Sequence, residues 1–450
     1  MKRVSRKINF KTDYIKFSRV QFKQNQKFLK FIYDILKDKE YIGSIVEIGI
    51  GSGHLAERLN RMFSPQRLYL IDINKYFLEH ASKLIPNARC VNKDILNVTI
   101  EDLDGRFVDV VVASNFLHWL SLRNGSWLNC VKLVYSFLNQ GGYFFVHQGL
   151  KWTYFPLYDL GAELFERMFG KKIDISEVLY YPYCHEILTN FKEAGFTVVA
   201  YKDFYELENS APYKQDDLYV SFSVAGINAF LSQIEDEKMK KMFEKEFLEL
   251  CRIYNPPIFS HRGFFALRKP YTDLDFRLIP PQTANDKEKQ KLTDFIKEVS
   301  SDFVPPLETR TPDSEFREAN LNYAEYLLRY YYNLVCFLRE NSDEWVGLLS
   351  FRIRESFSRP GVSCFYVSTL AVRRPFRNAK VASKLYQYFL DTVIGKYFGE
   401  RKIYLVETRT WADNVAVKKL LKNLGFSLTL VIPHDRGENI HTEYYVKEIR

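Results

Sequence analysis

The residues best suited to chemistry lie in a run of alternating glycines near the start of the chain. Residues 47–53 read Glu-Ile-Gly-Ile-Gly-Ser-Gly and follow the apolar pair Ile45 and Val46. Glycines allow positive φ and close approach of a ligand, and a helix beginning at Leu55 would offer unpaired N–H groups. A dinucleotide fingerprint needs its third glycine at the position of His54. The run therefore predicts a different cofactor cradle, between a buried strand and a helix.

Two acids follow in register with this loop. Asp72 ends the next expected strand, where a carboxylate can accept both ribose hydroxyls, and Asp94 follows the third, where one can accept an adenine amino group. The spacing Glu-x-Gly-x-Gly-x-Gly with both acids resembles the class I methyltransferases that use S-adenosylmethionine (SAM). The resemblance implies that SAM is bound by Glu47, Gly49, Gly51, Gly53, Asp72, Ile73, Asp94, Ile95 and Asn115.

The residues at the end of the fourth expected strand indicate a subgroup of these methyltransferases. Residues 108–119, followed by 141–143, look like small-molecule O-methyltransferases such as the malonyl-carrier-protein methyltransferase of biotin synthesis and trans-aconitate methyltransferase. Tyr14 and Gln21 match that group's opening helix, which covers SAM. The group usually has Gln at the position of His118. His118 is the candidate base for a hydroxyl acceptor and otherwise a pocket-wall residue, because a carboxylate nucleophile needs no base.

A second cofactor loop lies at residues 365–385. A strand ends in Leu370, Ala371 and Val372, and the run Arg377, Asn378, Ala379, Lys380, Val381 and Ala382 opens a helix. Successive N–H groups at a helix N-terminus suit the diphosphate of a cofactor. The run resembles the CoA-binding motif of GNAT acyltransferases, with Lys380 in place of a glycine. The resemblance implies that these residues bind acetyl-CoA or another acyl-CoA.

A later strand and helix extend the GNAT resemblance. Asn414 begins a helix that ends at residues 425–426, which implies that Asn414 contacts the pantetheine arm. The family often has a tyrosine acid where this chain has Leu421, so the acid is Tyr444, Tyr445 or water. Glu407 is the candidate base that deprotonates an amine, and the alternative is a strand carboxylate paired with Arg409.

The elements that must position these residues fall into two domains. Short apolar strands alternate with helices over residues 42–150, which predicts a parallel sheet. Residues 151–270 are interpreted as the end of this sheet with a hairpin near 195–205, a helix at Asp236–Cys251 and a helical lid. The pattern resets near residue 270, and the remainder predicts the order β-α-α-β-β-β-α-β-α-β-β. We expect a Rossmann-like α/β methyltransferase domain over residues 1–270 and an α+β GNAT domain over 271–450.

Composition limits the remaining classes of function. Of the net charge of +9, residues 1–30 account for the whole, with ten Lys and Arg against Asp13. This arm is a solvated helix face or a docking surface for an acidic partner. The six cysteines form no CxxC pair, so neither a metal site nor a disulfide framework is expected. No signal peptide or membrane span is predicted, which favours a cytoplasmic protein.

The preferred hypothesis is a bifunctional tailoring enzyme of small-molecule biosynthesis. One half methylates an acid or hydroxyl from SAM, and the other transfers an acyl group from acyl-CoA, most readily to an amine. Two alternatives stay open: the GNAT part serves only for docking, or the enzyme acts on carrier-protein thioesters. Methylation of nucleic acid is disfavoured because residues 114–117 lack the Asn/Asp-Pro-Pro-Tyr/Phe sequence of exocyclic-amine methylation.

Overall fold

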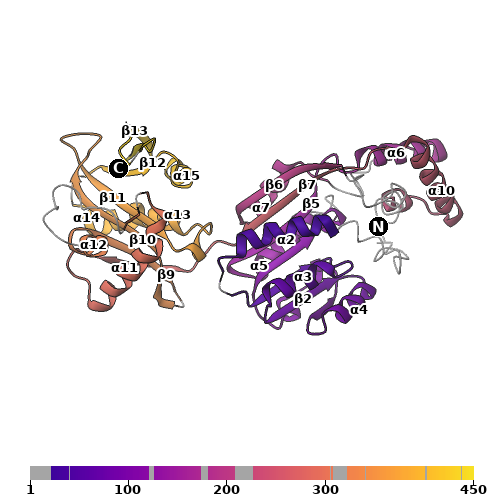
Figure 1. Ribbon diagram of the computed structural model, residues 1–450, viewed down its shortest axis with the longest axis horizontal. Coiled ribbons are helices and arrows are strands. Elements are labelled where there is room, and N and C mark those ends of the chain that lie inside the picture. The colour runs from indigo at the N-terminus through magenta and orange to yellow at the C-terminus, as the bar shows by residue number, and fades with distance from the viewer. Residues whose placement is uncertain are drawn as a thin grey trace. The chain divides into compact units, whose positions relative to one another are not determined.

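The computed structural model describes residues 22–39, 41–120, 126–173, 181–207, 227–304, 306–307, 322–339, 341–400, 403–436 and 438–449. The chain divides into two compact units, Met1–Pro270 and Tyr271–Arg450. Each unit contains one seven-stranded sheet, with helices packed against it (Figure 1).

The sheet of the first unit is mixed. Its strands are β1 Ser44–Ile48, β2 Arg67–Asp72, β3 Arg89–Asn92, β4 Val108–Ser114, β5 Leu138–Gly149, β6 Thr197–Leu207 and β7 Phe259–Arg268. They lie in the order β3-β2-β1-β4-β5-β7-β6, and β7 is antiparallel to both of its neighbours. The order reverses between β1 and β4, which are parallel. Ligands of open α/β sheets bind outside the carboxyl ends of the strands at such a reversal.

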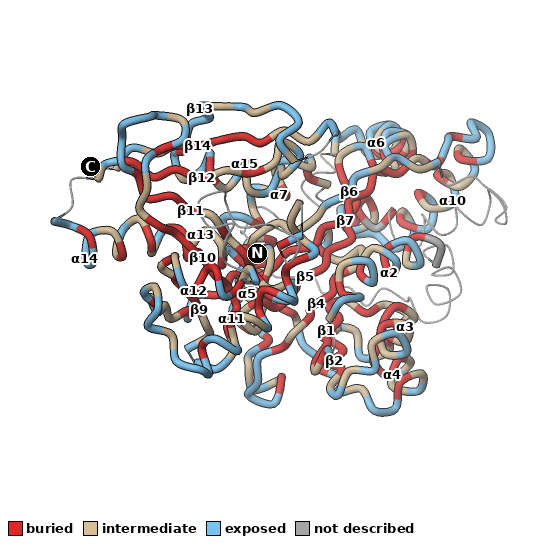
Figure 2. Tube along the Cα trace, turned by 60° about the vertical axis from the view of Figure 1, so that its left-hand side comes forward, coloured by how far each residue is buried: buried red, intermediate tan, exposed pale blue. Residues whose placement is uncertain are grey.

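Helices cover both faces of this sheet. They are α2 Phe22–Leu36, α3 His54–Phe63, α4 Lys75–Leu84, α5 Ser126–Phe137 and α7 Cys184–Glu193. Phe28, Leu59 and Leu78 belong to the core under α2, α3 and α4, whereas Trp127 and Phe191 belong to the core under α5 and α7. Strands covered on both faces are apolar throughout, and Figure 2 shows the central strands buried beneath helices with exposed outer surfaces.

A third core lies beside this sheet. α6 Phe155–Phe169, α9 Asn228–Leu231 and α10 Glu237–Tyr254 pack around Phe165, Phe230 and Phe243. α6 and α10 lie side by side beyond one end of β6 and β7 (Figure 1). The predicted helix at Asp236–Cys251 is confirmed as α10, which begins after the N-cap Asp236 and continues to Tyr254.

The predicted hairpin near residues 195–205 is wrong. Residues 197–207 form the single strand β6, which pairs antiparallel with β7 from Thr197 opposite Arg268 to Leu207 opposite Phe259. Gly195, at φ 99°, only completes the turn after α7. The partner strand therefore comes from more than fifty residues later in the chain.

The second unit follows the predicted order of elements, with residues 381–398 forming one continuous helix of α, π and α segments. Its strands are β8 Leu274–Ile279, β9 Tyr332–Leu338, β10 Asn341–Glu355, β11 Ser363–Val372, β12 Leu405–Trp411, β13 Ser427–Ile432 and β14 Thr442–Glu448. Its helices are α11 Asp286–Val299, α12 Tyr323–Tyr330, α13 Val381–Tyr388, α14 Ile394–Phe398 and α15 Val415–Asn423. The strand order is β13-β14-β12-β11-β10-β9-β8, and β11 and β12 pair in parallel.

The two faces of this second sheet have separate cores. Leu292 and Leu327 of α11 and α12 lie in one, and Leu385 and Leu421 of α13 and α15 lie in the other. α11 begins at Asp286 because Asn285 and Glu288 form a capping box. Within the described ranges, no helix is both long enough and apolar enough to span a bilayer.

Candidate active sites

The glycine loop turns between β1 and α3 at the point where the strand order reverses. Gly49, Gly51 and Gly53 have φ of 68°, 52° and 75°. A Cβ on Gly49 would lie 2.3 Å from the Phe116 ring, and one on Gly53 would lie 2.8 Å from the Ala81 side chain. All three positions favour glycine for the left-handed backbone, and at Gly49 and Gly53 a Cβ would also collide with a neighbouring side chain.

Two acids of the first unit lie beside this loop. Glu47 is only 2% exposed, and its Oε2 has no hydrogen-bond partner among the described residues. Burial, with the charge of Asp72 nearby, raises the pKa of Glu47 well above its usual value. Asp72 accepts hydrogen bonds from the backbone N–H of Gly51 at 3.4 Å and of Asn74 at 2.8 Å, although burial raises its pKa. A cationic ligand would meet two carboxylates here.

The other predicted ligands of this loop are distributed around it. Asp94 caps the short turn after β3, accepting from Leu96 N–H at 3.1 Å. Ile73 is 70% exposed, whereas the Ile95 side chain is buried in the core. Because Ile95 is a core residue, any contact with a cofactor would have to come from its backbone. Tyr14 and Gln21 lie outside the described residues.

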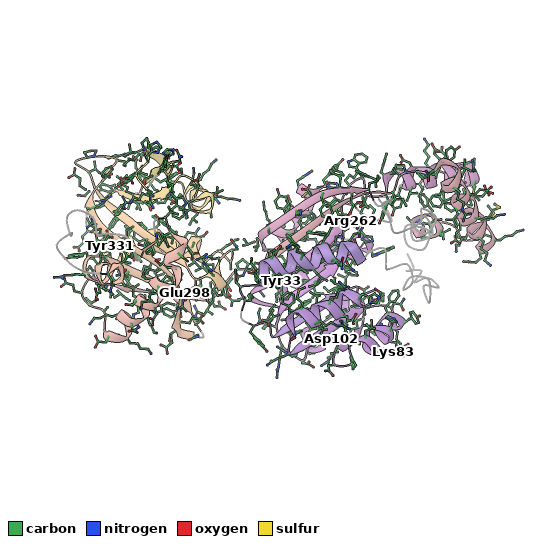
Figure 3. All side chains as sticks on the ribbon, viewed as in Figure 1. Tyr33, Lys83, Asp102, Arg262, Glu298 and Tyr331 are labelled. Carbon is green, nitrogen blue, oxygen red and sulfur yellow. The ribbon has the colours of Figure 1, made fainter. Side chains whose placement is uncertain are left out.

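A buried arginine reaches the end of β4. Asn115, at φ 50°, donates its N–H to His147 O at 2.8 Å. Arg262, near the start of β7, donates to Asn115 Oδ1 at 2.9 Å and to the Tyr154 hydroxyl at 2.8 Å. Arg262 is 3% exposed, and Figure 3 shows it at the end of the sheet nearest α6. The arrangement brings a fixed cation to the carboxyl ends of β4 and β5.

In the second unit, β11 and β12 separate toward their carboxyl ends. They pair only from Phe365 opposite Val406 to Val367 opposite Thr408. Ser368 is the extra residue of a β-bulge in β11, because the register with β10 shifts there. The ends of both strands beyond this ladder, residues 368–372 and 409–411, are therefore open toward each other.

The second cofactor loop starts where β11 ends. Asn378 and Lys380 have φ of 58° and 60°, and Lys380 is the N-cap of α13. The first N–H groups of a helix have no partner within it, and consecutive ones in such a turn form an anion-binding concavity. Arg377 fixes the loop by donating its Nε–H to Val372 O at 2.9 Å. Lys380 thus keeps the left-handed backbone that a glycine would adopt.

Two parts of the chain match known families. Residues 46–144 match a family described as "Methyltransferase domain", and residues 296–426 match the "Acetyltransferase (GNAT) family". The chain joins a methyltransferase domain to a GNAT acyltransferase domain. The predicted fold class, a Rossmann-like methyltransferase fold followed by a GNAT fold, is confirmed. No curated protein matches.

Solved structures with a likeness to this chain include the following three proteins. A putative methyltransferase from Bacillus halodurans C-125 is 14% identical with a TM-score of 0.36, covering 55% of this chain and 100% of its own. The N-methyltransferase NodS from Bradyrhizobium japonicum WM9 is 14% identical with a TM-score of 0.33, covering 56% and 98%. The cyclopropane synthase MmaA2 from Mycobacterium tuberculosis is 12% identical with a TM-score of 0.36, covering 60% and 100%.

His118 of the methyltransferase unit is a poor base. Burial, reinforced by the Arg262 charge, lowers its pKa to about 3, and the neighbouring Gln148 opposes this only in part. Its ring stacks on Tyr181 with centroids 5.5 Å apart, and Nδ1 has no hydrogen-bond partner among the described residues. This geometry supports the pocket-wall interpretation over the catalytic one, although the wall residue is not fully hydrogen-bonded.

His147, on β5, is a second buried histidine with a lowered pKa. It is fully buried, its Nδ1 lies 3.0 Å from Ser114 Oγ, and burial together with Arg262 lowers its pKa well below the usual value. Both histidines beside Arg262 are therefore neutral at physiological pH, and the net charge that they and Arg262 present is one positive charge.

The carboxylate of Glu407 in the GNAT unit is already hydrogen-bonded to a neighbouring turn. Its carboxylate accepts from the hydroxyls of Ser356 and Ser358 and from the backbone N–H groups of Phe357 and Ser358, at 2.7 to 3.0 Å. Although burial opposes it, these hydrogen bonds lower its pKa. Glu407 also lies on the paired half of β12, opposite Tyr366. The geometry therefore does not support Glu407 as a base, and it braces the β10–β11 turn instead.

The alternative for Glu407, an ion pair with Arg409, is wrong. Arg354 pairs with Glu407 at 3.3 Å, whereas Arg409 donates to the Tyr444 hydroxyl at 3.3 Å. Arg409 lies two residues after Glu407 on the same strand, but it is Arg354 of β10 that reaches the carboxylate.

The two tyrosines considered as acids are both committed to other groups. The Tyr445 hydroxyl donates to Glu443 at 2.5 Å, and burial raises the pKa of this tyrosine. Tyr444 accepts from Arg409 and stacks on the Phe357 ring with centroids 5.0 Å apart. Leu421 is fully buried in the core, and the Asn414 side chain caps α15 by accepting from Val417 N–H at 3.2 Å.

Two functional candidates, Arg262 and Asp302, were not predicted from the sequence. Arg262 stands in Ser260-His261-Arg262-Gly263, a polar run directly before the apolar stretch 264–267, and that run was the available signal. Asp302 pairs with Arg374 at 3.1 Å and with Arg377, but follows a helix in an unremarkable loop. Among the described residues, no three His, Cys, Asp or Glu side chains come together as a metal site.

Proposed function

We propose that the chain is a bifunctional tailoring enzyme of small-molecule biosynthesis, which transfers a methyl group from SAM to an acceptor oxygen and an acyl group from acyl-CoA to an amine. The observation that carries the first half is the pair Glu47 and Asp72 beside the glycine loop. The second half rests on the separated ends of β11 and β12 next to the anion-binding loop at the start of α13.

The residues of the glycine loop fit SAM. A buried carboxylate without a hydrogen-bond partner is costly unless a positive group meets it, and SAM brings a sulfonium and an ammonium group. Glu47 would face that positive charge, Asp72 would accept from ribose hydroxyls, and Gly49 and Gly51 leave the backbone open to close approach. SAM supplies an activated methyl group when bound, so the protein has mainly to align the acceptor.

Arg262 favours an acid as the acceptor. Its guanidinium is held at the end of β4 by Asn115 and Tyr154, and the fixed positive charge there attracts a carboxylate. A carboxylate oxygen attacks without a base, which agrees with the lowered pKa of His118. The product would be a methyl ester.

The GNAT unit fits acyl-CoA in the same way. The left-handed residues Asn378 and Lys380 shape the loop, and the first turn of α13 would face the diphosphate. CoA supplies an activated thioester when bound. Since Glu407 is held by Ser356 and Ser358, the removal of the amine proton is assigned to water.

The experiment that tests this function measures both cofactors and the bond formed. We expect S-adenosylhomocysteine and CoA each to bind the purified full chain by calorimetry. With tritiated methyl SAM, methylated product should release volatile methanol in mild base, as esters do and ethers or N-methyl compounds do not. Absence of binding of both cofactors would contradict the proposal, and a base-stable product would contradict ester formation alone.

The carrier-protein alternative gains no support from the described part of the basic arm. Lys27 pairs with Glu206 at 2.8 Å and Lys30 pairs with Asp34 at 3.4 Å, so both cations already have partners within their own unit. Most of the arm, residues 1–21, lies outside the described ranges.

A further inference from the structure

A short segment of the GNAT unit links three separate parts of that unit. Residues Ser300–Val304, called the strap here, follow α11 and begin with a 3₁₀ turn. Asp302 pairs with Arg374 and Arg377 of the cofactor loop. The Phe303 ring lies edge-on to Trp411, the last residue of β12, with centroids 6.4 Å apart. Val304 O accepts from Arg436 Nη1 at 2.7 Å.

These contacts surround the place where β11 and β12 separate. Arg377 is bonded to Val372, the last residue of β11, and Trp411 ends β12. The strap is therefore tied to the carboxyl ends of both strands, on which an acyl group and its acceptor would have to meet.

The contact of Asp302 has the chemistry of a phosphate contact. One carboxylate oxygen meets Arg374 and the other meets Arg377. Although burial opposes ionisation, hydrogen bonds from Arg377 and Arg374 lower the pKa of Asp302, so it carries its charge at neutral pH. A diphosphate carries more negative charge and more acceptor oxygens than one carboxylate and would compete for the same two guanidinium groups.

We propose that the Asp302 carboxylate occupies the place of the cofactor diphosphate at Arg374 and Arg377. Through these two ion pairs Asp302 holds the strap closed over the ends of β11 and β12, until the diphosphate of CoA binds the two arginines in its place. Binding of CoA then releases the strap and opens the way for the acceptor. This inference rests on the proposed use of acyl-CoA.

The first test measures affinity in the full chain by calorimetry. Asp302→Asn removes the competing charge at nearly constant shape, and we expect CoA to bind about fivefold to tenfold more tightly, as for the loss of two half-exposed ion pairs. Pantetheine, which lacks the diphosphate, should bind the variant and the parent equally. Glu448→Gln is the matched control: it removes a carboxylate paired with Arg359 at 2.7 Å, distant in sequence from the loop, and should leave both affinities unchanged.

The second test measures the strap itself by hydrogen–deuterium exchange. We expect the peptide containing Ser300–Val304 to exchange faster on addition of CoA, opposite to the usual protection by a ligand. Asp302→Asn should exchange at the fast rate without CoA. Arg436→Gln removes the hydrogen bond to Val304 O and should also speed exchange of the strap peptide, while changing CoA affinity by no more than about twofold.

The outcomes separate two failures. If neither the parent nor Asp302→Asn binds CoA, the proposed use of acyl-CoA is wrong, and the inference about the strap is wrong as well. If the parent binds CoA and the variant binds it no more tightly, or the strap peptide is unchanged or protected by CoA, only the strap inference is wrong. Binding of CoA by the variant alone supports it.

Discussion

At the scale of single residues, the buried carboxyl group of Glu47 lowers the stability of the ligand-free protein and favours the binding of SAM. Its folded-state pKa lies above the ordinary 4.5, so the folded protein holds the proton more tightly than the unfolded chain. Stability is therefore lost as pH rises above about 4.5, when the unfolded chain ionises. We expect Glu47→Gln to raise the melting temperature of the ligand-free protein at pH 8 and to weaken SAM binding at least tenfold.

Thermal unfolding at pH 5 and pH 8, with calorimetric titration of SAM, checks this prediction. Glu57→Gln is the control, because Glu57 is a helix-surface acid that pairs with Arg61. It should change neither quantity appreciably. A Glu47→Gln protein that is less stable at pH 8 would show that the carboxylate has a structural partner instead.

His118 gives a second prediction at this scale, concerning pH. With a pKa of about 3, its ring stays neutral between pH 5.5 and 8.5. We expect the methyl-transfer rate to show no ionisation of His118 in that range, and His118→Gln to reduce kcat by less than about tenfold, since a general base contributes 10²–10⁴-fold. A pH–rate profile of the parent and the variant checks both statements, and a loss of a thousandfold would restore His118 as the base.

What the sequence could predict at this scale was set by distance along the chain. The glycines and Asp72 were found because loop, strand and acid recur within a short, ordered stretch. Arg262 was missed because its partners Asn115 and Tyr154 lie 147 and 108 residues away, and no local spacing records such a contact. Glu407 was assigned a role in chemistry because its hydroxyl and amide partners come from a turn some fifty residues earlier.

At the scale of elements, Glu407 ties β12 to the β10–β11 turn. Removing its charge leaves Arg354, its partner at 3.3 Å, without a counter-ion and breaks a set of buried hydrogen bonds. We expect Glu407→Gln to destabilise the protein by about 3 kcal/mol, as for other broken buried pairs. The acyl-transfer rate per folded molecule should be unchanged, which urea unfolding and active-site titration together would establish.

The sign of the pH dependence offers a check on the same element. The pKa of Glu407 is lowered, so its stabilisation is present above the unfolded pKa of about 4.5 and is lost as pH falls through the folded value. Glu407→Gln should remove that acid sensitivity. If the variant keeps its stability but loses all acyl transfer, Glu407 is a base after all.

Helices and strands can be predicted where residues close together in the sequence determine their ends. α11 begins at Asp286, where the capping box of Asn285 and Glu288 is a short-range signal. β6 was mistaken for a hairpin because its pairing partner β7 is remote, and strand alternation alone does not specify a partner. The same limitation hid the separation of β11 from β12, which depends on a bulge at Ser368.

At the scale of the whole molecule, the cores do not mix. Every residue of the three buried clusters of the methyltransferase unit lies before Tyr271, and every residue of the two clusters of the GNAT unit lies at or after it. Each unit therefore has its own hydrophobic core, and ligand binding in one stabilises chiefly that core. Tandem transferases built in this way need share no residue between their sites.

Calorimetry of the full chain tests this independence. A ligand at a hundred times its Kd stabilises the unit that binds it by about 2.7 kcal/mol, which corresponds to roughly 5–10 °C for domains of this size. We expect two unfolding transitions, one raised by S-adenosylhomocysteine alone and the other by CoA alone. Gly49→Val, whose side chain would collide with the Phe116 ring, should abolish the first shift and leave the second intact. A single transition raised by either ligand would mean that the two cores unfold as one, and binding at one cofactor loop would then influence the other.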